Sequence, residues 1–182
     1  NVAFGMQALQ ASTTGSQNTA IGSYALFLNT TATGNTAVGE RALRGNTTGV
    51  SNVAVGRYAL TGNTTGYSNT AVGYNALSYN TTGYGNIANG IETLYSNTTG
   101  DYNVAAGYHA GKTITTGNHN IVFGYNAQPS SATVSGEFVL GSSNISTLRC
   151  NTSTISALSD ARDKTNVQGL NIILPVGISF YT

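Results

Sequence analysis

An all-β solenoid built from seventeen-residue coils is predicted for this chain of 182 residues. Charged residues make up only 7% of the chain, whereas Gly occurs 23 times and Trp is absent. Seventeen residues are too few for two helices with their turns, and the Gly and Asn content opposes helix formation. A β-roll or β-helix is therefore expected. The decisive observation is a repeat without slippage, in which Gly follows four residues after each Asn at 1, 18, 35, 52, 69, 86, 103 and 120.

Each unit reads N-T-A-V-G-x-x-A-L-x-x-N-T-T-G-x-x, and residues 69–85 are the clearest copy. The tracts T-A-V-G and A-L predict two short strands per coil, separated by turns. Parallel stacking at about 4.8 Å per coil would make eight coils about 40 Å long. We expect the fifth-position Gly at positive φ, and Asn at the first and twelfth positions in left-handed backbone or bonded to nearby backbone, with its amides stacked in ladders. Ala at the third and eighth positions predicts a thin interior.

The residue that follows the third-position Ala is expected on the outside of the coil, because side chains alternate between the two faces of a strand. An exposed apolar stripe along a rod needs a partner. A parallel homotrimer, intertwined or packed about the long axis, is the simplest assembly that hides it, and a monomeric solenoid is the alternative. The stripe consists of Ile21, Val38, Val55, Val72 and Phe123.

The repeats are assigned to residues 1–128. The eighth unit, NIVFGYNAQPSSATVSG, loses the N-T-T-G tract and gains Pro129, so it is predicted to be a capping unit. From about Ser130 the seventeen-residue register is expected to be lost. Residues 129–158 are predicted to form a β-rich connector with the strand-like tracts EFVLG, STLRC and STISAL.

A local concentration of charge follows the connector in ALSDARDKTNV, residues 157–167, which holds four of the thirteen charged residues in the chain. One explanation is a helix N-cap at Ser159, with acidic residues in the first turn. The other comes from a resemblance. The segment resembles the junction that opens the C-terminal intramolecular chaperone of endosialidases, phage tail spikes and long tail fibres, and the repeats resemble trimeric autotransporter adhesin heads and tail-fibre shafts.

The resemblance implies that residues 159–182 are the start of an incomplete chaperone domain, since that family continues well beyond the 23 residues after Ser159. It also implies self-cleavage of the Ser159–Asp160 bond, with Ser159 central to the chemistry and Lys164 as its partner. A Lys can activate a Ser hydroxyl only when burial or a neighbouring cation lowers the Lys pKa. Arg162 is the candidate for that electrostatic support.

The function that this resemblance implies is structural and adhesive. The chain is expected to be the shaft of a phage tail fibre on the virion, joined to other tail components and contributing to attachment to a host cell-surface glycan or protein. The alternatives are a bacterial trimeric adhesin at the cell surface and the shaft of an enzyme-bearing tail spike. No substrate-directed enzyme activity is expected, apart from self-cleavage in the full-length protein.

Other partners and cofactors are not expected. A formal charge of +1 gives no basic footprint for nucleic acid, and no apolar run is long enough for membrane insertion. No cofactor or metal site is predicted, since His109 and His119 lack nearby ligands at suitable spacing. Surface aromatic residues are weak candidates for sugar binding, and ladder packing on the surface is the alternative. These residues are Tyr24, Tyr58, Tyr67, Tyr74, Tyr84, Tyr108 and Tyr125.

Overall fold

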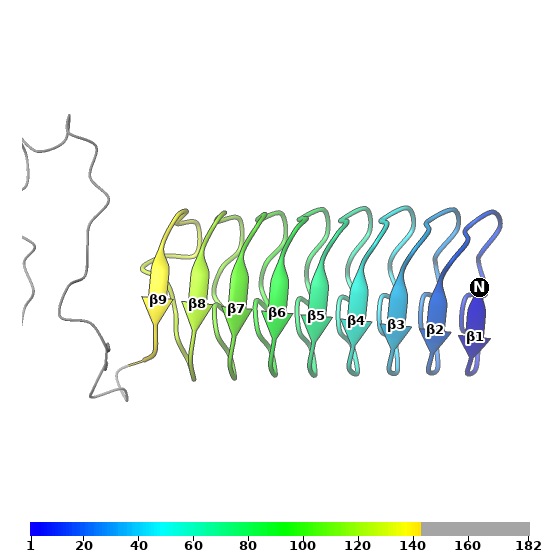
Figure 1. Ribbon diagram of the computed structural model, residues 1–182, viewed down its shortest axis with the longest axis horizontal. Coiled ribbons are helices and arrows are strands. Elements are labelled where there is room, and N and C mark those ends of the chain that lie inside the picture. Colours follow the sequence, from blue (N-terminus) through cyan, green and yellow to red (C-terminus); the bar gives the residue numbers. More distant parts are fainter. Residues whose placement is uncertain (143–182) are drawn as a thin grey trace, which may run out of the picture. The chain divides into compact units, whose positions relative to one another are not determined.

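The computed structural model describes residues 1–142, which wind into a β-solenoid (Figure 1). Within this range there is no helix, and nine strands form one parallel sheet in sequential order. The predicted all-β solenoid is confirmed. The strands are β1 (Val2–Phe4), β2 (Thr19–Ile21), β3 (Thr36–Val38), β4 (Val53–Val55), β5 (Thr70–Val72), β6 (Ile87–Asn89), β7 (Val104–Ala106), β8 (Ile121–Phe123) and β9 (Phe138–Leu140).

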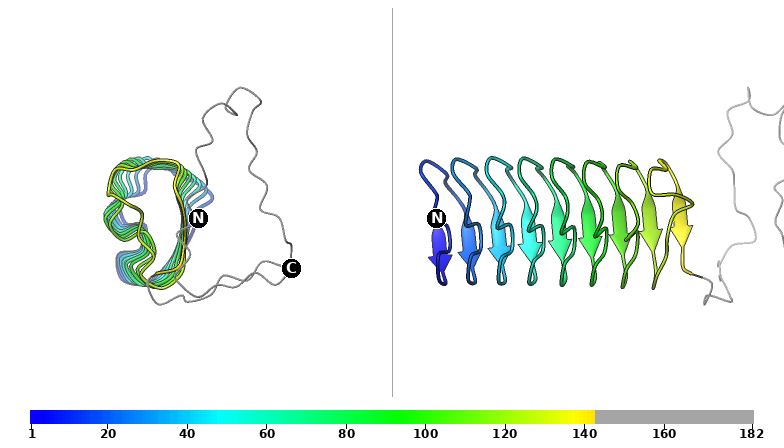
Figure 2. Two further views of the ribbon diagram at one scale, coloured as in Figure 1. Left: turned by 90° about the vertical axis from the view of Figure 1, so that its left-hand side faces the viewer. Right: turned by 180° about the vertical axis from the view of Figure 1, so that it is seen from behind.

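The coils stack with a constant register of seventeen residues. Ala37 pairs with Ala54, and Ala54 pairs with Ala71, so each repeat position forms a column that runs along the solenoid. Seen end-on, the coils superimpose on one closed outline (Figure 2). Every residue therefore has its equivalent in the next coil as a direct neighbour, and one favourable side chain can be used again in each coil.

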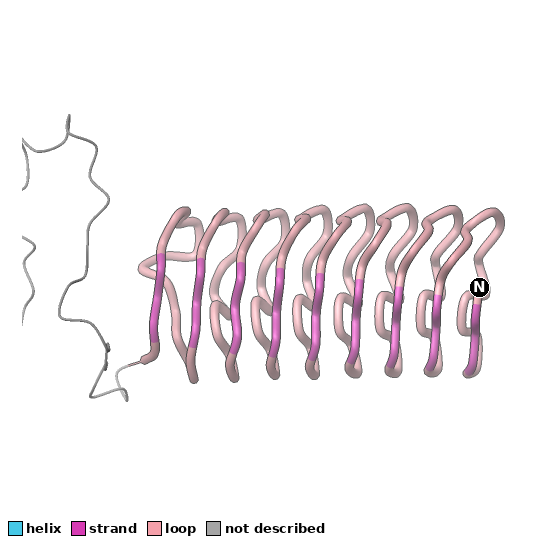
Figure 3. The backbone as a smooth tube through the Cα atoms, in the orientation of Figure 1, coloured by secondary structure: helices cyan, strands magenta, loops and turns pink. Residues whose placement is uncertain are grey.

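The prediction of two strands per coil is wrong, because each described coil has only one (Figure 3). The A-L tract lies instead in a turn that places two non-glycine residues in the left-handed region. In the fourth coil these residues are Tyr58, with φ of 62°, and Leu60, with φ of 51°. The alternating left-handed residues bend the chain and still direct the Leu side chain into the coil, where it is fully buried.

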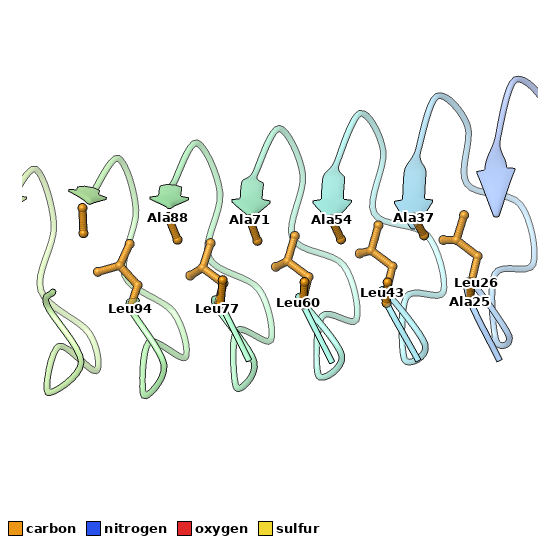
Figure 4. Close-up of a cluster of buried hydrophobic side chains, with 14 of the residues drawn as sticks. Ala25, Leu26, Ala37, Leu43, Ala54, Leu60, Ala71, Leu77, Ala88 and Leu94 are labelled. Atoms are coloured by element: carbon orange, nitrogen blue, oxygen red, sulfur yellow. The ribbon is translucent and has the colours of Figure 1, made fainter. Parts of the chain in front are cut away.

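Small apolar side chains fill the interior. Ala54 projects inward from β4, and Ala59 and Leu60 face it from the opposite side of the same coil, all without solvent exposure. Figure 4 shows Leu43, Leu60 and the equivalent Leu residues as one row and the strand Ala residues as another. The predicted thin interior is confirmed. Because each coil buries little apolar surface, hydrogen bonding between coils has to contribute much of the specificity.

Two columns of buried Asn residues line the turns beside this core. Asn52 Nδ2 donates to Asn35 Oδ1 at 3.2 Å, and Asn63 Nδ2 donates to Asn46 Oδ1 at 2.7 Å, so both predicted ladders form. Asn52 and Asn63 also donate to the same carbonyl oxygen, that of Gly66, at 2.8 and 2.9 Å. Of the two expectations for these Asn residues, left-handed backbone is not found, whereas bonding of the side-chain amide to nearby backbone is.

The fifth-position Gly is required by both backbone conformation and space. Gly39 has φ of +133°, as predicted, and a Cβ atom there would lie 2.6 Å from the carbonyl oxygen of Gly56 in the next coil. At the seventeenth position the demand is weaker. Gly34 has φ of +70°, but an added Cβ would meet nothing closer than 3.7 Å, and Ser51 occupies the same column with φ of 58°.

The register continues past the residue at which the sequence predicted its loss. Ile121 of β8 pairs with Phe138 of β9, and the Glu137 amide donates to Asn120 Oδ1 at 3.0 Å, as an Asn amide does in the earlier coils. The tract EFVLG is therefore the strand of a ninth unit. The predictions that the period ends near Ser130 and that the eighth unit ends the stack are wrong, and the connector cannot begin before Gly141. The tracts STLRC and STISAL lie outside the described residues.

Gly39→Ala and Gly34→Ala should separate the two kinds of Gly. Gly39→Ala forces a Cβ atom against backbone that cannot move without shifting the next coil, so we expect a loss of more than about 3 kcal/mol. Gly34→Ala should cost only about 1 kcal/mol, the penalty of left-handed backbone. Thermal unfolding followed by circular dichroism checks this ranking, and equal losses would contradict it.

Candidate interaction surfaces

The outer face of the sheet is open to solvent along the solenoid. The predicted stripe at the fourth position is exposed to solvent: the exposed fraction is 40% for Ile21 and 37% each for Val55 and Val72. Val38 is less exposed than these and is half-buried. The second position adds a parallel row that includes Ile87, exposed at 47%. We call these residues the apolar sheet face: Ile21, Val38, Val53, Val55, Val72, Ile87, Val104, Ile121 and Phe123.

The apolar sheet face is unusual because parallel sheets are normally covered on both sides. Here the coil interior covers one side, and no described residue covers the other. Asn89 and Ala106 interrupt the fourth-position row between Val72 and Phe123, while Ile87 and Val104 continue the second-position row past them. A continuous apolar strip of this kind is typical of a surface that is buried against another chain.

The predicted surface tyrosines fall into two groups. Tyr67 and Tyr84 stack with ring centroids 4.7 Å apart, and the contacts continue through Tyr102 to His119. The sequence analysis missed Tyr102 and His119 because they occupy the seventeenth position, whereas Tyr67 and Tyr84 occupy the sixteenth. Residues adjacent in the unit are brought together when the coils stack.

The second group follows the sixth and seventh positions but is not continuous. Tyr58 meets Tyr74 edge-on at 6.3 Å, and Tyr108 stacks on Tyr125 at 5.3 Å. Tyr24 contacts Phe27 at 5.5 Å, near the start of the solenoid. All seven predicted tyrosines therefore lie on the surface in ring contacts. Such contacts are compatible with ladder packing on the surface, and binding of a sugar by these rings stays a prediction.

A small ionic cluster lies on the sixth and seventh coils. Lys112 Nζ donates to Glu92 Oε2 at 2.6 Å, and His109 Nε2 lies 3.0 Å from the same oxygen. The hydrogen bond from Lys112, together with the positive charge nearby, lowers the pKa of Glu92 below its usual value of 4.5. Beside this cluster, the hydrogen bond with Tyr79 raises the pKa of Tyr95 to about 12. Tyr79 and Tyr95 were also missed by the sequence analysis.

Metal binding and membrane crossing find no support in the described range. Among residues 1–142, no group of three or more His, Cys, Asp or Glu side chains could hold a metal ion. The same residues contain no helix that is long and apolar enough to cross a membrane.

The fold and the repeat define this chain as a β-solenoid repeat protein. No protein-family model, curated protein or solved structure matches it. The predicted cleavage residues Ser159, Asp160, Arg162 and Lys164 lie outside the described residues. Both the resemblance to phage fibres and the self-cleavage therefore stay predictions.

Replacing Glu92 tests the ionic cluster through its pH dependence. Because the folded-state pKa is lowered, the carboxylate stabilises the fold above its ordinary titration range, and this contribution is lost as the pH falls through the lowered value. Glu92→Gln should cost about 0.5–1 kcal/mol at neutral pH, as expected for a part-buried ion pair at the protein surface. In urea unfolding, the difference from wild type should shrink as the pH falls below the usual carboxyl value of 4.5. A pH-independent difference would contradict this assignment, and Lys112→Gln should show the same trend.

Proposed function

We propose that this chain is a structural and adhesive segment of a homotrimeric fibre, the shaft of a phage tail fibre that contributes to host-surface attachment. The observation that carries the proposal is the exposed apolar sheet face. The core of the coils covers one side of the parallel sheet, and the apolar sheet face lies on the other side along the axis. Three chains packed in parallel about a common axis would bury three such faces against one another. Three is the number that the resemblance to phage fibres implies.

The construction of the coils supports a load-bearing role. Hydrogen bonds between neighbouring coils run along the axis from the strands, the Asn ladders and a column of Thr residues, in which Thr64 Oγ1 donates to the Thr81 carbonyl at 2.9 Å. Pulling the coils apart would have to break these bonds together. Side chains on the rest of the surface would then bind a glycan or protein of the host cell. Other tail components would bind the ends of the fibre.

A bacterial trimeric surface adhesin is the second candidate, because the N-T-A-V-G repeat also resembles adhesin heads. It shares the trimeric rod and differs only in what lies at the ends of the full-length protein. The shaft of an enzyme-bearing tail spike is the third reading. The mass of the assembly tests the architecture that all three have in common.

Val55→Glu combined with Val72→Glu should dissociate the trimer. The two carboxylates would be buried without partners at the centre of the apolar sheet face, at a cost of several kcal/mol. Native mass spectrometry should give three times the 18.7 kDa chain mass for wild type and a single chain for the variant. Thr31→Glu with Thr65→Glu adds the same charge at exposed turn positions and should stay trimeric. A monomeric or dimeric wild type would overturn the trimer.

Ser159→Ala and Lys164→Ala should each leave the full-length protein uncut. The first removes the hydroxyl and the second the base that the self-cleavage hypothesis assigns to them. Chain length on a denaturing gel is the measurement, and Ser156→Ala, three residues upstream, is the control that should be cut normally. Normal cleavage in both variants would exclude the chemistry and favour the helix-cap reading of this segment.

A further inference from the structure

Positive charge in the solenoid is concentrated at one place. Residues 1–142 contain four Lys and Arg residues, and three of them, Arg41, Arg44 and Arg57, lie in the third and fourth coils. All three side chains are exposed and lie beside aromatic rings. We call Tyr24, Phe27, Arg41, Arg44, Arg57 and Tyr58 the arginine–aromatic patch.

The rings hold the guanidinium groups in place. Arg41 lies between two tyrosines of its own column, 5.9 Å from the Tyr24 ring centroid and 5.5 Å from that of Tyr58, and its Nη1 donates to the Tyr58 hydroxyl at 3.2 Å. The Arg57 guanidinium lies 4.7 Å from the centroid of the Tyr58 ring, and its Nη2 donates to the Tyr58 hydroxyl at 3.3 Å. Arg44 lies 5.6 Å from the Phe27 centroid. Stacking of this kind restricts a flexible side chain before any ligand arrives.

The patch has more positive charge than its one carboxylate can balance. Glu40 Oε2 accepts from Arg57 Nε at 2.9 Å, and Glu40 Oε1 is 3.8 Å from Arg41. Within residues 1–142, Arg44 makes no ion pair. Three guanidinium groups against one carboxylate leave two positive charges in excess. Surface ion pairs contribute little to folding, so ion pairing does not explain why three arginines gather here.

We propose that the arginine–aromatic patch binds an anionic saccharide through its carboxylate, sulfate or phosphate groups. Guanidinium groups match such anions through paired N–H donors, and the neighbouring Tyr74 ring, which no guanidinium group covers, offers apolar surface to a sugar ring. The exposed ring of Tyr74 next to Tyr58 extends this surface into the fifth coil. Binding of an anionic saccharide does not depend on the proposed function, but its role in host attachment rests on that function.

A saccharide fits the patch better than a nucleic acid does. Bases bind single-stranded sites by stacking on free aromatic faces, but Arg41 lies over the rings of both Tyr24 and Tyr58. Three cations within two coils also form a compact site, whereas nucleic-acid affinity depends on many phosphate contacts along a track. The solenoid surface offers no such track, since Lys112 is the only other Lys or Arg within residues 1–142.

Binding to soluble polysaccharides tests the proposal on the full chain. Calorimetric titration with dextran sulfate and carboxymethyl dextran should show binding that weakens with added salt, and neutral dextran should not bind. The two anionic polymers distinguish sulfate from carboxylate as the preferred group. Arg41→Gln with Arg44→Gln should weaken binding by about tenfold or more, because two charge-assisted contacts are lost.

The matched control is Thr31→Glu with Thr65→Glu, which lowers the net charge by the same two units at exposed residues that are not part of the patch. This control should keep most of the affinity for the anionic dextrans. If it loses as much affinity as the Arg→Gln variant, binding depends only on net charge and the proposed site is overturned. Arg→Lys at 41, 44 and 57 keeps the charge but removes the planar donors, so it should weaken binding as well. Tighter binding of an oligothymidylate than of either anionic dextran would replace the saccharide with a nucleic acid.

The mass of the same samples separates this proposal from the trimer. If a monomeric protein binds the anionic dextrans, the saccharide site is supported and the trimeric fibre is overturned. If a trimeric protein binds neither anionic dextran, the saccharide site is overturned and the trimeric architecture is supported.

Discussion

The in-register stacking of the first-position Asn is the interaction on which the other features of the solenoid depend. Each coil has an interior of Ala and Leu, which buries too little apolar surface to fix the turns by packing alone. In the fourth coil, for example, the Asn52 amide bonds the Asn35 side chain behind it and the Gly66 carbonyl of its own coil, and its Oδ1 accepts from the backbone of Asn69. One side chain thus closes its own coil and sets the register of the next.

This register explains why the chain tolerates unfavourable backbone. A non-glycine residue in the left-handed region costs about 1–2 kcal/mol, yet the ninth position places Leu there in six successive coils. Full burial of a Leu side chain returns about 1.5–3 kcal/mol, and here the Leu side chains of successive coils form one row within the buried core cluster. The strain and the burial roughly offset each other at every coil. Gly39 and its equivalents have no such freedom, because the carbonyl of the next coil occupies the space a Cβ atom would need.

The period, the parallel stacking, the inward Ala residues and the outward Val residues could be read from the sequence, because they follow from column spacing and strand alternation. The turn at Tyr58 and Leu60 could not, since an apolar pair gives no sign that the backbone is left-handed. The tract EFVLG was predicted to be strand-like, but its place as a ninth coil was missed because Glu137 replaces the expected Asn, although its backbone amide makes the same bond. The arginine–aromatic patch was missed for a different reason. Tyr24, Arg41 and Tyr58 follow one another at seventeen-residue intervals in one column, but only the tyrosines of that column were considered, and Arg41 between them was not.

The seventh coil shows which of the two ladders the structure needs. Gly111 replaces the Leu of the ninth position and Ile114 replaces the Asn of the twelfth, and the buried Ile114 side chain lies against the space that the Leu would fill. The exchange leaves Asn97 Oδ1 buried without a hydrogen bond, a loss of about 1–3 kcal/mol that burial of Ile can offset. The second ladder therefore stops at Asn97, yet β7 and β8 still pair in register. The first ladder continues through Asn103 to Asn120, so it is the column that carries the register to the ninth strand.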